Sequence, residues 1–141
     1  MSFSKVYSAQ TSALSAGIVS VETDITPRTL YAFAVVGLPD KAVEESRDRL
    51  SSAIKNSGYD SPKAQNHKIV ISLAPASEKK EGPSFDVAMA LSYLLSAEEI
   101  DFDPEKKVFL GELSLDGTLR PVRGVLPITQ FAKLKGIKEL Y

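Results

Sequence analysis

The stretch that decides the fold runs from Leu30 to Leu50 and reads LYAFAVVGLPDKAVEESRDRL. Its first part, Leu30 to Val36, is apolar on both faces, which is typical of a central strand. Gly37-Leu38-Pro39-Asp40 ends this strand, and the apolar positions that follow recur with the spacing of an amphipathic helix. We therefore predict a strand, a turn and a helix in succession, with Gly58 ending the helix.

Alternation and turn residues predict the elements on either side of this stretch. Upstream, Val19 to Ile25 alternates apolar and polar residues as a strand does, and Phe3 to Ala9 is a second strand. Downstream we predict a strand over His67–Leu73, an apolar helix over Phe85–Ala97, a short strand over Val108–Leu110, a hairpin turn at Asp116-Gly117 and a helix over Val125–Lys135. Strands first, then alternating helices and strands, indicate an α+β fold with helices packed on a mixed sheet.

Composition bounds the class of protein. The 141 residues are 43% hydrophobic and 25% charged with a formal net charge of -1, which fits one soluble domain over residues 1–141. The absence of cysteine excludes disulfides, thiolate catalysis and Cys-based zinc sites, and a single histidine argues against a His-based metal site or catalytic triad. No apolar run approaches the roughly 18 residues of a membrane span. We expect a cytoplasmic domain with no membrane partner, and, because a strand begins at Ile137 near the chain end, a longer parent protein.

Three blocks of sequence carry a family resemblance. They run from Val36 to Leu50, from Ser72 to Val87 and from Leu110 to Gly117. In this order and spacing they resemble the N-terminal domain of the ComM/YifB family of bacterial magnesium-chelatase-like AAA+ proteins. The motif residues are Gly37, Pro39, Glu81, Gly82, Pro83, Ser84, Asp86, Gly111, Glu112 and Gly117.

This resemblance implies a Lon-protease-like fold, similar also to the C-terminal domain of RadA. It implies a parent that carries a downstream AAA+ ATPase module in cis, assembles as a ring, and binds ATP and Mg only in that module, with no cofactor or metal in this domain. In the ComM branch the parent drives branch migration of DNA during recombination in natural transformation. We therefore expect a non-catalytic accessory domain that helps to assemble the ring or guides DNA.

Ser84 is the residue on which an enzymatic alternative rests. Lon uses a Ser-Lys dyad whose serine lies in a Gly-Pro-Ser turn, and the resemblance places Ser84 there and Ile128 at the lysine position. Because isoleucine cannot accept a proton, we predict a degenerate nucleophile position. We expect bulky Phe85 to crowd an approaching peptide, and the Ser84 hydroxyl to cap the following helix, with Asp86 favoured by the helix dipole. The alternative is a Ser-dependent peptidase that uses Ser84.

Binding functions are further alternatives. The turn at Gly82 could hold a phosphate with help from Lys79 and Lys80, but the nearby acidic residues oppose this and no P-loop is present. A DNA-binding module would use Lys63, Lys68, Lys79, Lys80, Arg120 and Arg123. We expect His67 to lie at the surface. We expect Glu112 to accept hydrogen bonds from the turn that follows it. Glu45 and Arg49 are spaced to form an ion pair on one face of a helix.

Overall fold

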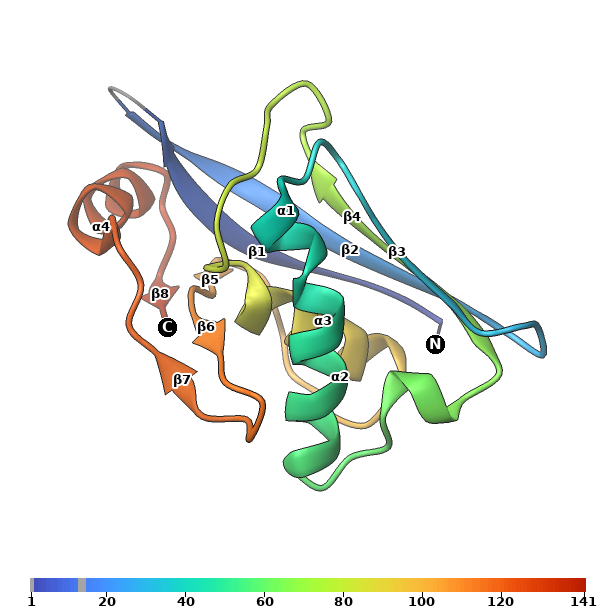
Figure 1. The fold of residues 1–141 in the computed structure, drawn as a ribbon. Helices are drawn as coiled ribbons and strands as arrows, with labels where there is room; N and C mark the ends of the chain where they lie inside the picture. Colours follow the sequence, from blue (N-terminus) through green and yellow to red (C-terminus); the bar gives the residue numbers. More distant parts are fainter. Residues whose placement is uncertain (1, 13–14) are drawn as a thin grey trace.

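The computed structural model describes residues 2–12 and 15–141, and its main feature is a mixed four-stranded sheet (Figure 1). The strands lie in the order β1-β2-β4-β3, with β1 and β2 antiparallel, β2 and β4 antiparallel, and β3 and β4 parallel. Their bounds are β1 Phe3–Ser12, β2 Ser15–Pro27, β3 Ala32–Val36 and β4 His67–Ala74. The mixed sheet and its packed helices confirm the predicted α+β class.

Helices and short strands complete the chain. The helices are α1 Lys41–Glu44, α2 Ser46–Asn56, α3 Asp86–Ser96 and α4 Val125–Leu134, with a 3-10 turn η1 at Pro62–Ala64. Two short strand pairs follow, β5 Lys107–Val108 with β8 Glu139–Leu140, and β6 Glu112–Leu113 with β7 Leu119–Arg120. The turn of the β6–β7 hairpin lies at the predicted Asp116-Gly117. Among the described residues, no helix is long and apolar enough to cross a bilayer.

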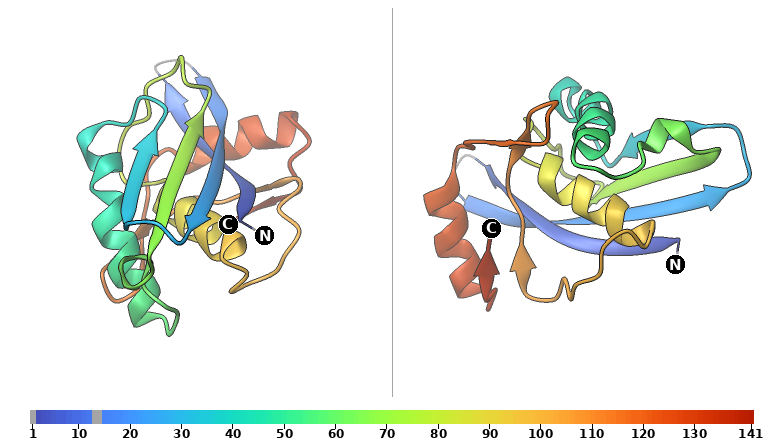
Figure 2. Two further views of the ribbon diagram at one scale, coloured as in Figure 1. Left: turned by 90° about the vertical axis from the view of Figure 1, so that its right-hand side faces the viewer. Right: turned by 90° about the horizontal axis from the view of Figure 1, so that it is seen from below.

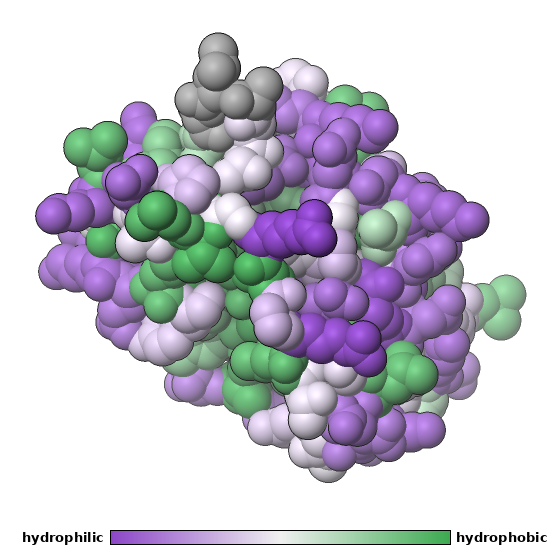
Figure 3. Space-filling model, turned by 60° about the vertical axis from the view of Figure 1, so that its left-hand side comes forward, coloured by the Kyte–Doolittle hydropathy of each residue, from purple (hydrophilic) through white to green (hydrophobic). Residues whose placement is uncertain are grey.

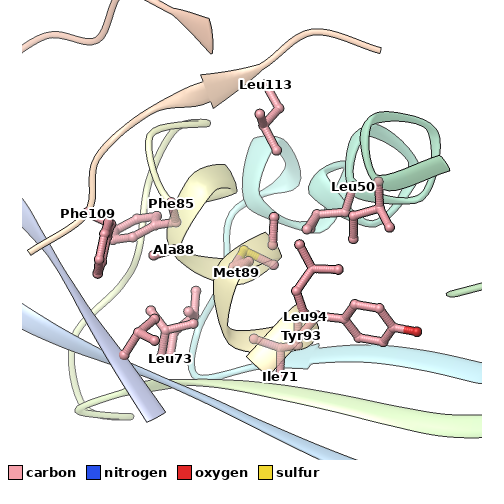
Figure 4. Packing of buried hydrophobic residues seen from close by; sticks show 14 of the residues in the cluster. Leu50, Ile71, Leu73, Phe85, Ala88, Met89, Tyr93, Leu94, Phe109 and Leu113 are labelled. Carbon is pink, nitrogen blue, oxygen red and sulfur yellow. The ribbon is translucent and has the colours of Figure 1, made fainter. Parts of the chain in front are cut away.

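The main core lies between one face of the sheet and the helices α2 and α3. Alternate residues of β2 and β4, including Val21 and Ile71, are fully buried on this face. Leu50 of α2 and Met89 of α3 pack over them (Figure 4). Burying one such side chain contributes about 1.5–3 kcal/mol. A smaller cluster around Ala9 and Ile128 holds α4 near the end of the β1–β2 hairpin (Figure 2).

Buried hydroxyl groups join α3 to the first two strands. Ser92 Oγ lies 2.7 Å from Thr23 Oγ1 and 3.1 Å from Ser4 Oγ, and Ser96 Oγ donates to Ser4 Oγ at 2.7 Å. All four residues are buried. Each of these hydroxyl groups has a hydrogen-bond partner within the group. The buried serines of α3 therefore fit into a helix that the sequence predicted to be apolar.

Two predictions about the Leu30–Leu50 stretch are wrong. β3 is an edge strand and not a central one, because β4 lies between it and β2. The predicted single helix is interrupted at Glu45, which separates α1 from α2. The position of β3 depends on a contact with a distant segment, since β4 pairs with it on one side and with β2 on the other.

Candidate functional site

The turn after β3 and the loop before α3 are held together by backbone and carboxylate hydrogen bonds. The Lys80 N–H donates to the Leu38 carbonyl at 2.9 Å, and the Asp40 N–H donates to the Lys80 carbonyl at 2.9 Å. The Asp40 carboxylate accepts from the Val43 N–H at 2.8 Å and from the Gly82 N–H at 3.0 Å. Asp40 therefore caps α1 and also positions the loop that leads to Ser84.

At two motif glycines, another part of the chain lies so close that a side chain would clash with it. Gly37 has φ +105°, and a Cβ there would lie 2.0 Å from the Leu73 carbonyl oxygen. A Cβ at Gly111 would lie 2.5 Å from Cγ2 of Val87, at the start of α3. These glycines let the turn after β3 lie against β4 and let the segment before β6 lie against α3.

The start of α3 differs from the prediction for Ser84. The helix begins at Asp86 and its N-cap residue is Phe85, with no side-chain hydrogen bond at the cap, so the predicted Ser84 cap is wrong. The segment before β6 supplies hydrogen bonds at the start of α3 instead. Gly111 donates its N–H to the Ser84 carbonyl at 3.0 Å and accepts from the Val87 N–H at 3.1 Å. A backbone carbonyl thus satisfies a helix N-terminal donor that a hydroxyl was expected to satisfy.

Phe85 points into the core and not toward the surface. Its side chain is fully buried and lies beside Phe109 (Figure 4). The expectation that Phe85 crowds an approaching peptide is therefore wrong. The sequence contained a signal for this burial, because Phe85 lies one turn before Met89 on the apolar side of the helix.

A cavity of about 350 Å³ lies beside the Gly82-Pro83-Ser84 turn. Ser84 and Ile128 both line it, although they come from distant parts of the chain. The other lining residues are Gln10, Thr11, Glu81, Glu112, Pro121, Val122 and Arg123. As far as the structure describes this lining, it contains no lysine or histidine, and Ile128 is buried. The face that carries α4 and β7 shows a patch of hydrophobic surface (Figure 3), and Leu119, Val125 and Leu126 are exposed there.

Asp86 is the most extensively bonded motif residue. Its carboxylate is fully buried and accepts from Ser46 Oγ at 2.5 Å, from Arg49 Nε at 2.7 Å and from the Leu113 N–H at 3.0 Å. This hydrogen bonding raises the pKa of the Arg49 guanidinium. Arg49 therefore pairs with Asp86 and not with the predicted Glu45, and this ion pair joins α2 to α3. The N–H of Leu113, beside Glu112, donates to the Asp86 carboxylate and not to that of Glu112.

Three of the basic residues proposed for anion binding have partners within the domain. Lys80 is fully buried, its ammonium group donates to the Pro75 carbonyl, and burial lowers its pKa. It therefore cannot contact a phosphate or DNA from the surface, contrary to the prediction. Lys79 lies 3.9 Å from Glu81, and Lys63 lies 3.2 Å from Asp48, both as exposed ion pairs.

His67 and clusters of carboxylates are the groups that could bind a metal ion. His67 is partly exposed, as a surface histidine would be, but its Nδ1 atom is buried without a hydrogen-bond partner. Within residues 2–12 and 15–141, no group of three or more His, Asp or Glu side chains is placed to hold a metal ion.

Comparison with known proteins gives the family. A family model described as "Subunit ChlI of Mg-chelatase" matches residues 21–141. The chain belongs to the Mg-chelatase ChlI family. Competence protein ComM of Haemophilus influenzae is 37% identical over 141 residues, covering 99% of this chain and 27% of ComM. YifB of Escherichia coli is 39% identical over 127 residues, covering 89% of the chain and 24% of YifB.

A third relative in this family, an uncharacterized protein of Mycobacterium tuberculosis, is 40% identical over 137 residues, covering 96% of the chain and 26% of that protein. These relatives confirm the predicted resemblance to ComM and YifB. The chain spans about a quarter of the length of the curated relatives it matches.

Proposed function

We propose that this chain is a non-catalytic accessory domain of a ComM/YifB-type AAA+ ATPase. The observation that carries the proposal is the cavity shared by Ser84 and Ile128. A serine nucleophile needs a neighbouring base that accepts its proton. Ile128, which lines the same cavity, is aliphatic and cannot accept this proton, and the lining as described holds no lysine or histidine. A serine in these surroundings stays a protonated, poorly reactive hydroxyl.

The motif residues support a structural role for this region. Asp86 joins α2, α3 and β6 through Arg49, Ser46 and Leu113. Asp40 joins α1 to the loop at Gly82. These two carboxylates fix the relative position of four elements, and their hydrogen bonds to neighbouring groups are those of structural residues. A rigid body of this kind suits a domain that positions a neighbouring module.

The family supports a proposal for the activity of the longer protein. In this proposal the longer protein binds ATP and Mg in a downstream AAA+ module, assembles as a ring in the cytoplasm and remodels DNA. The name of the Haemophilus influenzae relative, a competence protein, supports a role in DNA uptake or recombination. This domain would then help to assemble the ring or guide DNA toward it, and it would need no cofactor of its own.

The test uses the full-length protein in three forms: unmodified, lacking residues 1–141, and carrying Ser84→Ala. We expect the deletion to impair ring assembly or DNA-dependent ATP hydrolysis, and Ser84→Ala to leave both unchanged. Normal assembly and activity after the deletion would overturn the accessory role. Labelling of Ser84 by a serine-directed fluorophosphonate, lost in Ser84→Ala, would instead support the peptidase.

A further inference from the structure

Helix α4 carries more apolar side chains than the domain buries. Most residues of its sequence, VLPITQFAKL, are apolar, but the buried ones are Ile128 and Ala132. On the outer side, 69% of Leu126 and 86% of Leu134 are exposed. Helix α3 is similarly apolar, and it is buried along most of its length. Because a helix that is apolar on both sides is normally covered on both sides, the outer side of α4 has the composition of a contact surface.

Helical spacing collects the exposed side chains of α4 into one row. Leu126, Gln130 and Leu134 follow one another at intervals of one turn, so they lie along the same side of the helix. Lys133 lies beside this row, two turns after Leu126. Figure 3 shows hydrophobic surface on the face that carries α4, with hydrophilic side chains around it. An exposed apolar patch with a polar rim is typical of an interaction site.

The surroundings of this row are basic. No Asp or Glu occurs from Gly117 to Lys138, although the whole chain has a net charge of -1. The basic residues of this segment are all exposed, and they are Arg120, Arg123, Lys133, Lys135 and Lys138. Within residues 2–12 and 15–141 none of them forms an ion pair, and the next carboxylate along the chain, that of Glu139, lies 4.0 Å from Lys107. A partner that complements this surface carries both apolar side chains and carboxylates.

Tyr141, directly after β8, is fixed in the fold close to α4. Its N–H donates to the Val108 carbonyl at 2.9 Å, and its carbonyl accepts from the Leu110 N–H at 2.9 Å. Leu140 of β8 packs in the same cluster as Ile128 of α4, and the two elements lie side by side in Figures 1 and 2. In the proposed longer protein, whatever follows Tyr141 is therefore tethered within reach of α4. A short tether raises the effective concentration of the attached segment to about the millimolar range.

We propose that the outer side of α4 binds the part of the longer protein that follows Tyr141. That part places apolar side chains over Leu126 and Leu134, and carboxylates beside the α4 lysines, which are Lys133, Lys135 and Lys138. The inference rests on the proposed function, because it needs a longer parent. The chain covers 27% of ComM and 24% of YifB, which supports such a parent.

The exposed leucines favour a protein segment over nucleic acid at this surface. The backbone of a nucleic acid offers phosphates, which suit lysine, but it offers no apolar side chains to cover Leu126 and Leu134. Contacts between parts of one chain combine apolar and polar groups, as this surface does. Such a contact gives the accessory domain a fixed position relative to the module that it serves.

Carbodiimide cross-linking of the full-length protein tests the charges of this contact, because the reagent joins a lysine to a carboxylate that touches it. We expect the α4 lysines to be joined to Asp or Glu residues beyond Tyr141 of the same subunit, and mixed isotope-labelled subunits identify links within one subunit. Lys41 and Lys68 are exposed lysines on other elements, and they should give no such products. Products from the control lysines in equal yield would overturn the proposal. Products formed only with a second copy of residues 1–141, or none from the α4 lysines, would also overturn it.

A neutral leucine substitution tests the apolar part of the contact. Leu134→Gln in the full-length protein should lower the yield of these products about tenfold, which corresponds to about 1.4 kcal/mol of contact free energy. Leu30→Gln is the matched control, since 88% of Leu30 is exposed and the β2–β3 connection lies far from α4 (Figure 1). Circular dichroism establishes that both variants are folded. Equal yields from the two variants would overturn the proposal.

DNA is the alternative ligand of this surface. The test is the binding of labelled double-stranded DNA by the full-length protein and by its Lys133→Gln variant. We expect equal affinities, because the proposal assigns Lys133 to a carboxylate. Weaker DNA binding by the variant, together with no cross-links from the α4 lysines, would identify a DNA contact and overturn the proposal.

The accessory role and the α4 contact fail in different ways. Normal assembly and activity after deletion of residues 1–141 would overturn the accessory role, even if the α4 lysines form cross-links. An impaired deletion variant combined with missing cross-links would leave the accessory role standing and overturn the α4 contact alone.

Discussion

Arg49 Nε lies 2.7 Å from Asp86 Oδ2, and this ion pair joins the helix after β3 to the helix after the Gly-Pro-Ser turn. The Asp86 side chain is fully buried and that of Arg49 is 19% exposed. Ser46 and the Leu113 N–H complete the hydrogen bonding of the carboxylate. The charge is therefore stable inside the protein only while all of these partners are present.

Asp86→Ala should destabilise the protein severely. Removing one partner of a buried pair leaves the other charge uncompensated and costs about 3–5 kcal/mol. Urea denaturation measures the loss. The matched control is Asp48→Ala, since Asp48 pairs with Lys63 at the surface and its side chain is 80% exposed. The control should lose less than about 1 kcal/mol. Similar losses for the two variants would contradict the structural role of Asp86.

Asp40→Ala and Ser84→Ala should differ in stability. The Asp40 carboxylate accepts from the N–H groups of Val43 and Gly82, so its removal should cost about 1–2 kcal/mol. No side-chain hydrogen bond occurs at the N-terminus of α3, so Ser84→Ala should change the free energy of unfolding by less than about 0.5 kcal/mol. Thermal unfolding measures both. A loss near 1 kcal/mol for Ser84→Ala would restore the original cap prediction.

Gly37→Ala should destabilise the protein more than Gly58→Ala. Both glycines have positive φ, at +105° and +93°, so both variants carry backbone strain of about 1–3 kcal/mol. Only at Gly37 would the new methyl group also meet a backbone atom, 2.0 Å from the Leu73 carbonyl oxygen, while the space at Gly58 is open. Chemical denaturation of the two variants isolates the steric part. Equal losses would show that the turn moves away from β4 without cost.

Stability should fall in alkali partly because of Tyr93. Burial, with nearby Glu99 and Asp60, raises the pKa of Tyr93 from 10.0 to about 12. Between these values the unfolded chain loses the tyrosine proton and the folded chain keeps it, so the free energy of unfolding decreases as pH rises from 10 toward 12. The decrease should be shallower in Tyr93→Phe than in the unmodified protein. Denaturation curves at several pH values check this, and identical slopes in the two proteins would contradict it.

The sequence by itself determined the local elements and the family. The alternation of Val19 to Ile25, the hairpin turn at Asp116-Gly117 and the stop of α4 before Gly136 depend on neighbouring residues only, and the structure has all three. Matching the motif blocks predicted Ile128 at the position of the catalytic base, and Ser84 and Ile128 line one cavity, but the degenerate dyad stays a prediction. That the domain is non-catalytic and belongs to a longer ATPase stays a prediction.

Only the tertiary structure decided which distant groups meet. Arg49 pairs with Asp86 and not with Glu45, because the packing of α2 against α3 brings a buried carboxylate within reach. Lys80 is buried although its neighbour Lys79 is exposed, since the bridge to Pro39 turns one side chain inward. The apolar strand at Ala32 to Val36 lies at the sheet edge because β4 pairs with β2 on its other side. Hydrophobic periodicity records whether a residue avoids water, but strand order and ion-pair partners depend on contacts between segments far apart in the chain.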